Sequence, residues 1–287
     1  MNQALHYTPG LYITATPIGN MGDITLRALD ALGKVDAIAC EDTRETGKLL
    51  AGHGIKAEGR LIAYHEHNAD KMRPKIMDMI AKGQSVALVS DAGMPLVSDP
   101  GYRLVRDCRE KGLTVTCLPG ASATLAALVL SGLPTDRFFF AGFLPPKSGA
   151  RKTALAEISA VPATLIFYET GPRLANSLSD MVTVLGDRAA TVLRELTKKF
   201  EETRHGTLAT LAAHYKDSGP PRGEIVIVIE GPVAKPPASA EEVDQRLQTL
   251  ILKEKMSTKD AAAQIAAETG WKKKDVYAQA VKISQSS

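Results

Sequence analysis

A loop of small and polar residues, VSDAGMPLVSDPG at positions 89–101, is the part of this chain best suited to bind a ligand. It follows an apolar run at 85–89, which we interpret as a buried strand, and it precedes a helical pattern at 102–111. An open α/β sheet binds its ligand in loops at the carboxyl ends of its strands. A second such turn, LPGAS at 118–122, also links an apolar run to a helix. The two turns predict a bound cofactor, with plain solvated connections as the alternative.

Three further loops place acidic beside basic residues, and each follows a strand-like run: CEDTRET at 40–46, ETGPR at 169–173 and RELTKKFEET at 194–203. If these loops meet at one edge of the sheets, they form a polar site that could bind a charged substrate and move a proton. Solvated loop tips with incidental ion pairs are the alternative.

Several common motifs are absent from the sequence. There is no GxGxxG, no GxxxxGK followed by Ser or Thr, and no GxSxG, which argues against a dinucleotide fingerprint, a P-loop and an α/β-hydrolase. His65 and His67 would share one face of a strand, but no third ligand is recognisable. We therefore expect polarity at a strand end there and no metal site.

The composition limits which kinds of protein this chain could be. The 287 residues suggest about two domains, and an apolar content of 44% allows a sizeable core. The net charge is only +3, so contact with nucleic acid would need local basic patches. Three cysteines without a CxxC fit free thiols in a reducing compartment. The N-terminus lacks a signal-peptide pattern, and the apolar stretch at 121–129 is too short to span a bilayer, so we expect a soluble, cytoplasmic protein.

Residues 1–133 alternate strand and helix patterns, with Asp23 or Thr25 as candidate cap of the first helix. Such alternation predicts an α/β domain with a mostly parallel sheet covered on both faces. The strands are expected at 11–16, 37–40, 61–64, 86–89 and 114–118.

Residues 134–231 predict a second, mixed α/β domain, with strands at 138–146, 163–170, 191–196 and 224–231 and a helix at 208–217. Residues 232–240 read as a linker. Residues 241–287 predict a small helical module, in which Ser257 and Asp260 form a capping pair and Gly270 ends a helix. A helix-turn-helix and a helical cap or dimer arm are equally compatible with this pattern.

Eight strings between Leu11 and Gly231 occur together in one order. They are TPIGNMGDITLRAL, EDTR, VSDAGMPLVSDPGYRLV, LPGASA, GFLPPK, ETGPR, LTKKFEE and GEIVIVIEG. Together these strings resemble the tetrapyrrole methylase superfamily of S-adenosylmethionine-dependent methyltransferases. Within it they are similar to members that methylate a cytidine ribose 2′-hydroxyl in 16S rRNA of the small ribosomal subunit. The resemblance implies two α/β domains with the cofactor in the cleft between them, and a homodimer.

The resemblance also implies which residues hold S-adenosylmethionine. Where tetrapyrrole-modifying relatives show GxGPGD and GGDP turns, this chain has TPIGNMGD and VSDAGMP, which argues against a porphyrinoid substrate. The implied cofactor residues are Pro17, Gly19, Ser90, Asp91, Ala92, Gly93, Val97, Gly120, Ser122, Ala123, Tyr168, Leu196 and Pro221.

Methyl transfer to a ribose hydroxyl requires an aligned hydroxyl and removal of its proton. The candidate bases are Asp42, Glu41 and Glu169, of which Asp42 falls where relatives carry an acid credited with taking a proton. A tetrapyrrole methyltransferase and a non-catalytic RNA-binding assembly factor stay open as alternatives. The candidates for binding RNA phosphates are Arg44, Arg173, Lys198, Lys199, Lys272, Lys273 and Lys274.

Trp271 adjoins the last three of these lysines. It could stack on a base, or it could form the core of the helical module.

Overall fold

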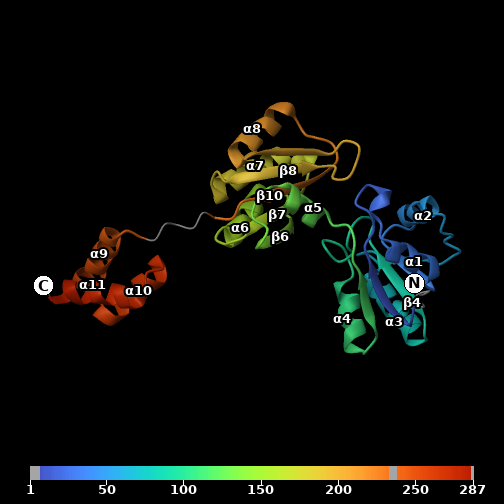
Figure 1. Cartoon of the computed structure of the whole chain (residues 1–287), viewed down its shortest axis with the longest axis horizontal. Coiled ribbons are helices and arrows are strands. Elements are labelled where there is room, and N and C mark those ends of the chain that lie inside the picture. Colours follow the sequence, from blue (N-terminus) through green and yellow to red (C-terminus); the bar gives the residue numbers. More distant parts are fainter. Residues whose placement is uncertain (1–6, 233–237, 286–287) are drawn as a thin grey trace. The chain divides into compact units, whose positions relative to one another are not determined.

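The structure is a computed structural model that describes residues 7–232 and 238–285 (Figure 1). The chain divides after Pro232 into two compact units. Most of the expected linker, residues 233–237, lies outside the described residues. The expected boundary between two α/β domains, residues 1–133 and 134–231, stays a prediction.

The first sheet is entirely parallel, in the order β3-β2-β4-β1-β5. Its central strands are buried on both faces, as expected where helices cover both sides. Ile76 and Leu104 pack on one face, and Leu32 and Leu50 pack on the other. The strands are β1 (Gly10–Thr14), β2 (Ala37–Cys40), β3 (Leu61–Ala63), β4 (Ser85–Val89) and β5 (Val115–Leu118), and the helices are α1 (Leu26–Lys34), α2 (Thr43–Gly52), α3 (Ala69–Ala81), α4 (Tyr102–Glu110) and α5 (Ala123–Leu130), with a 3-10 turn at Met21–Asp23.

Every expected strand of this sheet is therefore present to within two residues. Thr25 caps α1, because its side chain accepts a hydrogen bond from the N–H of Ala28. Since all five strands are parallel, the loops that follow β1, β2 and β4 emerge at one edge of the sheet.

The second sheet is mixed, in the order β6-β7-β10-β8-β9, with β6 and β7 parallel and the other pairs antiparallel. The sequence did not predict β9, which falls partly in the expected charged loop at 194–203. β9 is a polar edge strand without a buried face, so it carries no alternating apolar pattern. The elements are β6 (Phe138–Phe143), β7 (Thr164–Thr170), β8 (Ala189–Arg194), β9 (Glu202–Thr207), β10 (Glu224–Ile229), α6 (Ser148–Ile158), α7 (Gly171–Leu185) and α8 (Leu208–Ser218).

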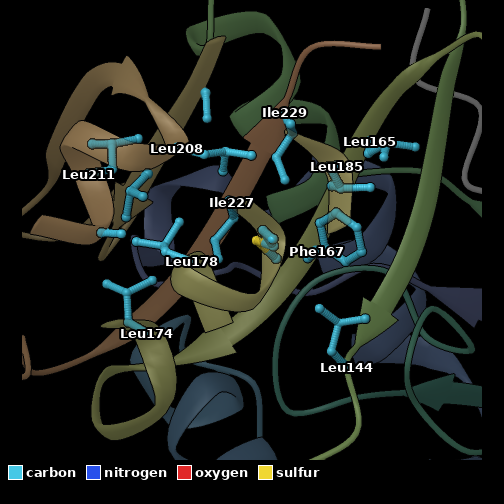
Figure 2. Close-up of a cluster of buried hydrophobic side chains, with 14 of the residues drawn as sticks. Leu144, Leu165, Phe167, Leu174, Leu178, Leu185, Leu208, Leu211, Ile227 and Ile229 are labelled. Atoms are coloured by element: carbon cyan, nitrogen blue, oxygen red, sulfur yellow. The ribbon is translucent and has the colours of Figure 1, made fainter. Parts of the chain in front are cut away.

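Alternate residues of β7 and β10 enter two different cores. Phe167 and Ile227 point toward Leu178 and the other leucines of α7 and α8 (Figure 2). Their neighbours Ile166, Val226 and Val228 point to the other face. There they pack against Ala127 and Leu128 of α5 and against Ile18, which follows β1. This second core joins the end of the first α/β half to the second sheet.

The second unit is a set of short helices around its own core, which includes Val243, Ile265 and Val276. The expected caps are present: Ser257 accepts from the N–H of Asp260, and Gly270 ends α10 in the left-handed conformation at φ +73°. The elements are α9 (Ala240–Gln248), a π-helical turn (Thr249–Lys253), α10 (Thr258–Thr269) and α11 (Lys273–Gln285). Across the two units, no described helix has the length and apolarity that a membrane span requires.

One buried ion pair fixes α6 to α7. The guanidinium of Arg151 lies 2.7 Å from Asp180, and both side chains are at most 10% exposed. Ser148 also donates a hydrogen bond to Asp180. Although burial raises the pKa of Asp180, the hydrogen bonds from Arg151 and Ser148 outweigh it and lower that pKa.

We predict that Asp180→Ala lowers the free energy of unfolding by about 3–5 kcal/mol, because it leaves the Arg151 charge buried and unpaired. Asp78→Ala is the control, since the exposed Asp78–Lys82 pair should contribute less than about 1 kcal/mol. Urea unfolding measures both, and equal losses would contradict the assignment. Because the pKa of Asp180 is lowered on folding, its contribution should be present at neutral pH and disappear as the pH falls through that pKa.

Candidate active site

Two adjoining cavities open where the first sheet's loops face the second sheet. The first, of about 390 Å³, is lined from one side by the loops after β2 and β4 and from the other by β7 and β10. The second, of about 380 Å³, is lined by residues after β1, by α2 and by Lys198. The two cavities share the residues Ile18, Asp91, Ala92 and Glu224.

The loop after β4 is tied to the loop after β1. Thr16 and Gly93 exchange backbone hydrogen bonds of 2.9 and 3.1 Å, and the hydroxyl of Thr16 donates to the carbonyl of Ser90. Leu96 and Ser98 have positive φ angles of 75° and 68°. Residues other than glycine adopt this conformation only where the surrounding structure imposes it, which is common at ligand sites.

The structure brings most of the implied cofactor residues to these cavities. Those at the first cavity are Asp91, Ala92, Gly93, Val97, Ser122, Ala123, Tyr168 and Leu196, and those that line the second include Pro17, Gly19 and Ser90.

Gly120 and Pro221 line neither of these cavities. A Cβ on Gly120 would lie 2.9 Å from the Cβ of Ala15, so this glycine allows the β5–α5 turn to approach the end of β1. The carbonyl of Pro221 would clash with a Cβ on Gly171, so this glycine allows Pro221 to pack closely on the start of α7.

The sequence did not single out several residues of the first cavity. Phe143 lies at its wall with its ring 5.5 Å from that of Tyr168. Asp99 and Glu224 bring two further carboxylates to it. Asp99 lies in the loop at 89–101, which the sequence indicates as ligand-binding without distinguishing this aspartate from the other polar residues. The apolar residues around Phe143 and Glu224 indicate only strands.

Burial is the main cause that raises the pKa of three carboxyl groups of the first cavity. Burial, and then the negative charges of Asp91 and Asp99, raise the pKa of Glu41. Loss of water at the cavity wall raises the pKa of Asp91, and burial raises that of Asp99, although a hydrogen bond from Ser90 opposes the shift. The cavity is therefore an acidic environment that suits a cation.

Asp42 adjoins this cavity through Asp91, but its own carboxylate is engaged with Arg44. Its carboxylate caps α2 by accepting from the N–H of Arg44, and it also pairs with that guanidinium at 2.6 Å. These hydrogen bonds lower the pKa of Asp42. Its backbone N–H donates to the carboxylate of Asp91 at 3.0 Å, which places Asp91 at the cavity.

Glu169 lines the first cavity but is only 3% exposed, and hydrogen bonds and an ion pair hold its carboxylate in place. It accepts from the backbone N–H of Thr170 and the hydroxyl of Ser177. Arg173 Nε lies 3.1 Å away as an ion pair, without the alignment of a hydrogen bond. These contacts fix the end of β7 to α7.

The expected phosphate-binding cations differ in their surroundings, four lying on the first unit and three on the second. Arg44 and Arg173 are engaged with Asp42 and Glu169. Lys198 lines the second cavity and pairs with Glu195 and Glu224 at 2.9 and 2.8 Å. Lys199 is exposed, with its ammonium 5.6 Å from the ring centre of Phe200. Lys272, Lys273 and Lys274 are exposed on the second unit.

His65 and His67 do not share a strand face, because β3 ends at Ala63 and both lie at the following turn. Their ring centres are 6.0 Å apart. The described residues contain no group of three potential ligands that could hold a metal ion.

The chain matches two families along its length. Residues 10–212 match the Tetrapyrrole (Corrin/Porphyrin) Methylases, and residues 237–284 match the RsmI C-terminal HTH domain. A ribosomal RNA small subunit methyltransferase I of Mesorhizobium japonicum is 51% identical over 97% of this chain and 94% of its own length. A protein of the same name from Escherichia coli O157:H7 is 48% identical over 93% of each chain.

Solved structures share the fold of the first unit. A uroporphyrin-III C-methyltransferase from Thermus thermophilus, solved in complex with S-adenyl homocysteine, superposes with a TM-score of 0.53 at 20% identity, over 77% of this chain and 97% of that one. The fold, the family matches and the near-complete relatives agree. The chain belongs to the tetrapyrrole (corrin/porphyrin) methylase family, in the group of the ribosomal RNA small subunit methyltransferase I proteins.

Proposed function

We propose that this protein is an S-adenosylmethionine-dependent methyltransferase that methylates the ribose 2′-hydroxyl of a cytidine in 16S rRNA of the small ribosomal subunit. The observation that carries the proposal is about 50% identity, over more than nine-tenths of the chain, to small-subunit rRNA methyltransferases. The likeness includes the C-terminal module. This substrate would place the protein in the cytoplasm.

The first cavity fits this cofactor in charge and shape. S-adenosylmethionine supplies a methyl group on a positively charged sulfonium. The carboxylates of Asp91 and Asp99 would face that positive charge, and the small side chains of Ala92, Gly93 and Ala123 leave room for the ligand. Tyr168 and Leu196 would hold the adenine against the second sheet.

Glu41 is the best placed of the three candidate bases. It lines the cavity, and its raised pKa makes it a stronger base than an ordinary carboxylate. Asp42, with its lowered pKa, caps α2 and positions Asp91, while Glu169 holds β7 to α7. Glu41 would therefore accept the proton of the ribose 2′-hydroxyl.

The two other functions are less well supported. A tetrapyrrole methyltransferase would share the fold, but those solved relatives are at most 20% identical to this chain. A non-catalytic RNA-binding factor would have no need of carboxylates whose pKa is raised within a cavity.

A homodimer is the expected assembly, and one face of the first unit supports it. Leu125, Val129 and Leu130 of α5 are 45–68% exposed. Phe138, on the edge strand β6, is 44% exposed and lies on the same face of the strand as Phe140, which packs in the same core as α5. An exposed apolar helix beside an unpaired strand edge suits burial against a second copy.

Incubation with a tritiated methyl donor and small ribosomal subunits should label 16S rRNA, and nuclease mapping should place the label on one cytidine ribose. Heat-denatured enzyme is the control. Absence of label from the RNA, or a label on a base, would contradict the proposed reaction.

Gly93→Val should weaken cofactor binding at least about tenfold, because its side chain would enter the first cavity next to Ile18. Gly54→Val is a matched control. Gly54 also has a positive φ, +71°, but no atom lies within 4 Å of its added Cβ. Titration calorimetry with S-adenosylhomocysteine compares the two folded variants, and equal affinities would argue against this cavity.

Glu41→Gln should slow single-turnover methyl transfer about 10²- to 10⁴-fold while cofactor affinity stays close to wild type. Asp42→Asn should slow it far less, because asparagine also caps a helix. Since Glu41 must be ionised to act and its pKa is raised, the wild-type rate should fall as the pH is lowered through that pKa. A larger loss of methyl-transfer rate in Asp42→Asn than in Glu41→Gln would identify Asp42 as the base.

A further inference from the structure

The accessible aromatic side chain at the lysine-rich end of the second unit is that of Tyr277, because Trp271 is packed against the core. The indole Nε1 of Trp271 donates to the carbonyl of Ala238 at 2.7 Å, and its ring packs against the core of the unit. Trp271 thus fixes the start of α9 to the turn between α10 and α11. Tyr277, four residues into α11, is 46% exposed.

Tyr277 shares one face of α11 with two lysines. Lys273 lies four residues before it and Lys274 three residues before it, so their side chains are neighbours on the helix surface. Both lysines are exposed. Val276 and Ala280, on the adjoining side of the helix, are fully buried in the core and anchor it there. We call Lys273, Lys274 and Tyr277 the α11 face (Figure 1 shows α11 at the red end of the chain).

No ion pair within the described part of the chain neutralises the lysines at the start of α11. None of Lys272, Lys273 and Lys274 forms an ion pair with another described residue. They occupy the beginning of α11, where cations are unfavourable because the helix dipole is positive at that end. Four lysines and one aspartate lie at 270–285, whereas residues 238–269 carry four basic and six acidic residues. Three of these four lysines lie at the start of α11, so their positive charge is placed there against the preference of the helix.

We propose that the α11 face binds an unpaired segment of the ribosomal RNA, with the ring of Tyr277 stacked on a base and Lys273 and Lys274 paired with the flanking phosphates. An exposed ring beside two cations matches the two parts of a nucleotide, and stacking requires a base that is not held in a duplex. The inference rests on the proposed function, and it names the residues by which the second unit grips that substrate.

The test is the affinity of the full-length protein for small ribosomal subunits, measured across a salt titration. Tyr277→Ala should weaken binding about 5- to 150-fold without changing the salt dependence, because it removes stacking alone. Tyr277→Phe should bind like wild type, because its ring is kept. The double variant Lys273→Ala, Lys274→Ala should reduce the slope of log K against log salt by about 1.4.

A double variant of two other exposed lysines of the unit, Lys253→Ala and Lys259→Ala, is the matched control and should leave the salt slope unchanged. Wild-type affinity of Tyr277→Ala would overturn the proposal, as would a loss in Tyr277→Phe equal to that in Tyr277→Ala. A change of oligomeric state in Tyr277→Ala would also overturn it, because the face would then contact a second copy.

Methyl transfer by the wild-type protein is measured in parallel. If the wild type methylates the RNA while the α11 variants bind normally, this inference alone fails. If the wild type transfers no methyl group to the RNA, the proposed function itself fails.

Discussion

The whole site depends on the way in which β7 and β10 divide their side chains between two cores. One set of alternate residues, with Phe167 and Ile227, holds α7 and α8. The other set, with Ile166 and Val228, packs against α5 and Ile18 from the first α/β half. Because the strand period is two, a slip of one residue would exchange these sets and bury neither face correctly. This shared core holds the two walls of the first cavity together.

The first cavity gathers carboxyl groups whose pKa is raised. Burial and the repulsion of neighbouring carboxylates raise the pKa of Glu41 and Asp99, which is an unfavourable arrangement unless a cation enters. The nearby Lys198 is already paired with Glu224, which lines both cavities. A positively charged cofactor would thus be favoured within the cavity.

The sequence predicted the parallel sheet and singled out loops that line the first cavity, because both depend on local patterns. Continuous apolar runs indicated the buried strands, and small residues indicated the loop that Thr16 and Gly93 fix in place. The edge strand β9 was missed because its polar residues have no buried face.

Other features depend on contacts that no local pattern records. Glu41 and Asp42 are adjacent, and only the structure shows that one lines the cavity while the other caps a helix. Phe143 and Glu224 reach the cavity because of sheet geometry, which their own segments do not indicate. Likewise, the sequence left two roles open for Trp271, and its hydrogen bond to Ala238 identifies it as a structural residue.

If one cofactor site is built from both α/β halves of the first unit, a bound cofactor must contact both halves. Amide hydrogen exchange with and without S-adenosylhomocysteine measures this. Binding should protect the loop at 90–101 and, at the same ligand concentration, the segments at 168–170 and 223–226 on the second sheet. Protection confined to one of the two halves, or appearing only outside these segments, would show that the halves do not share a cofactor site.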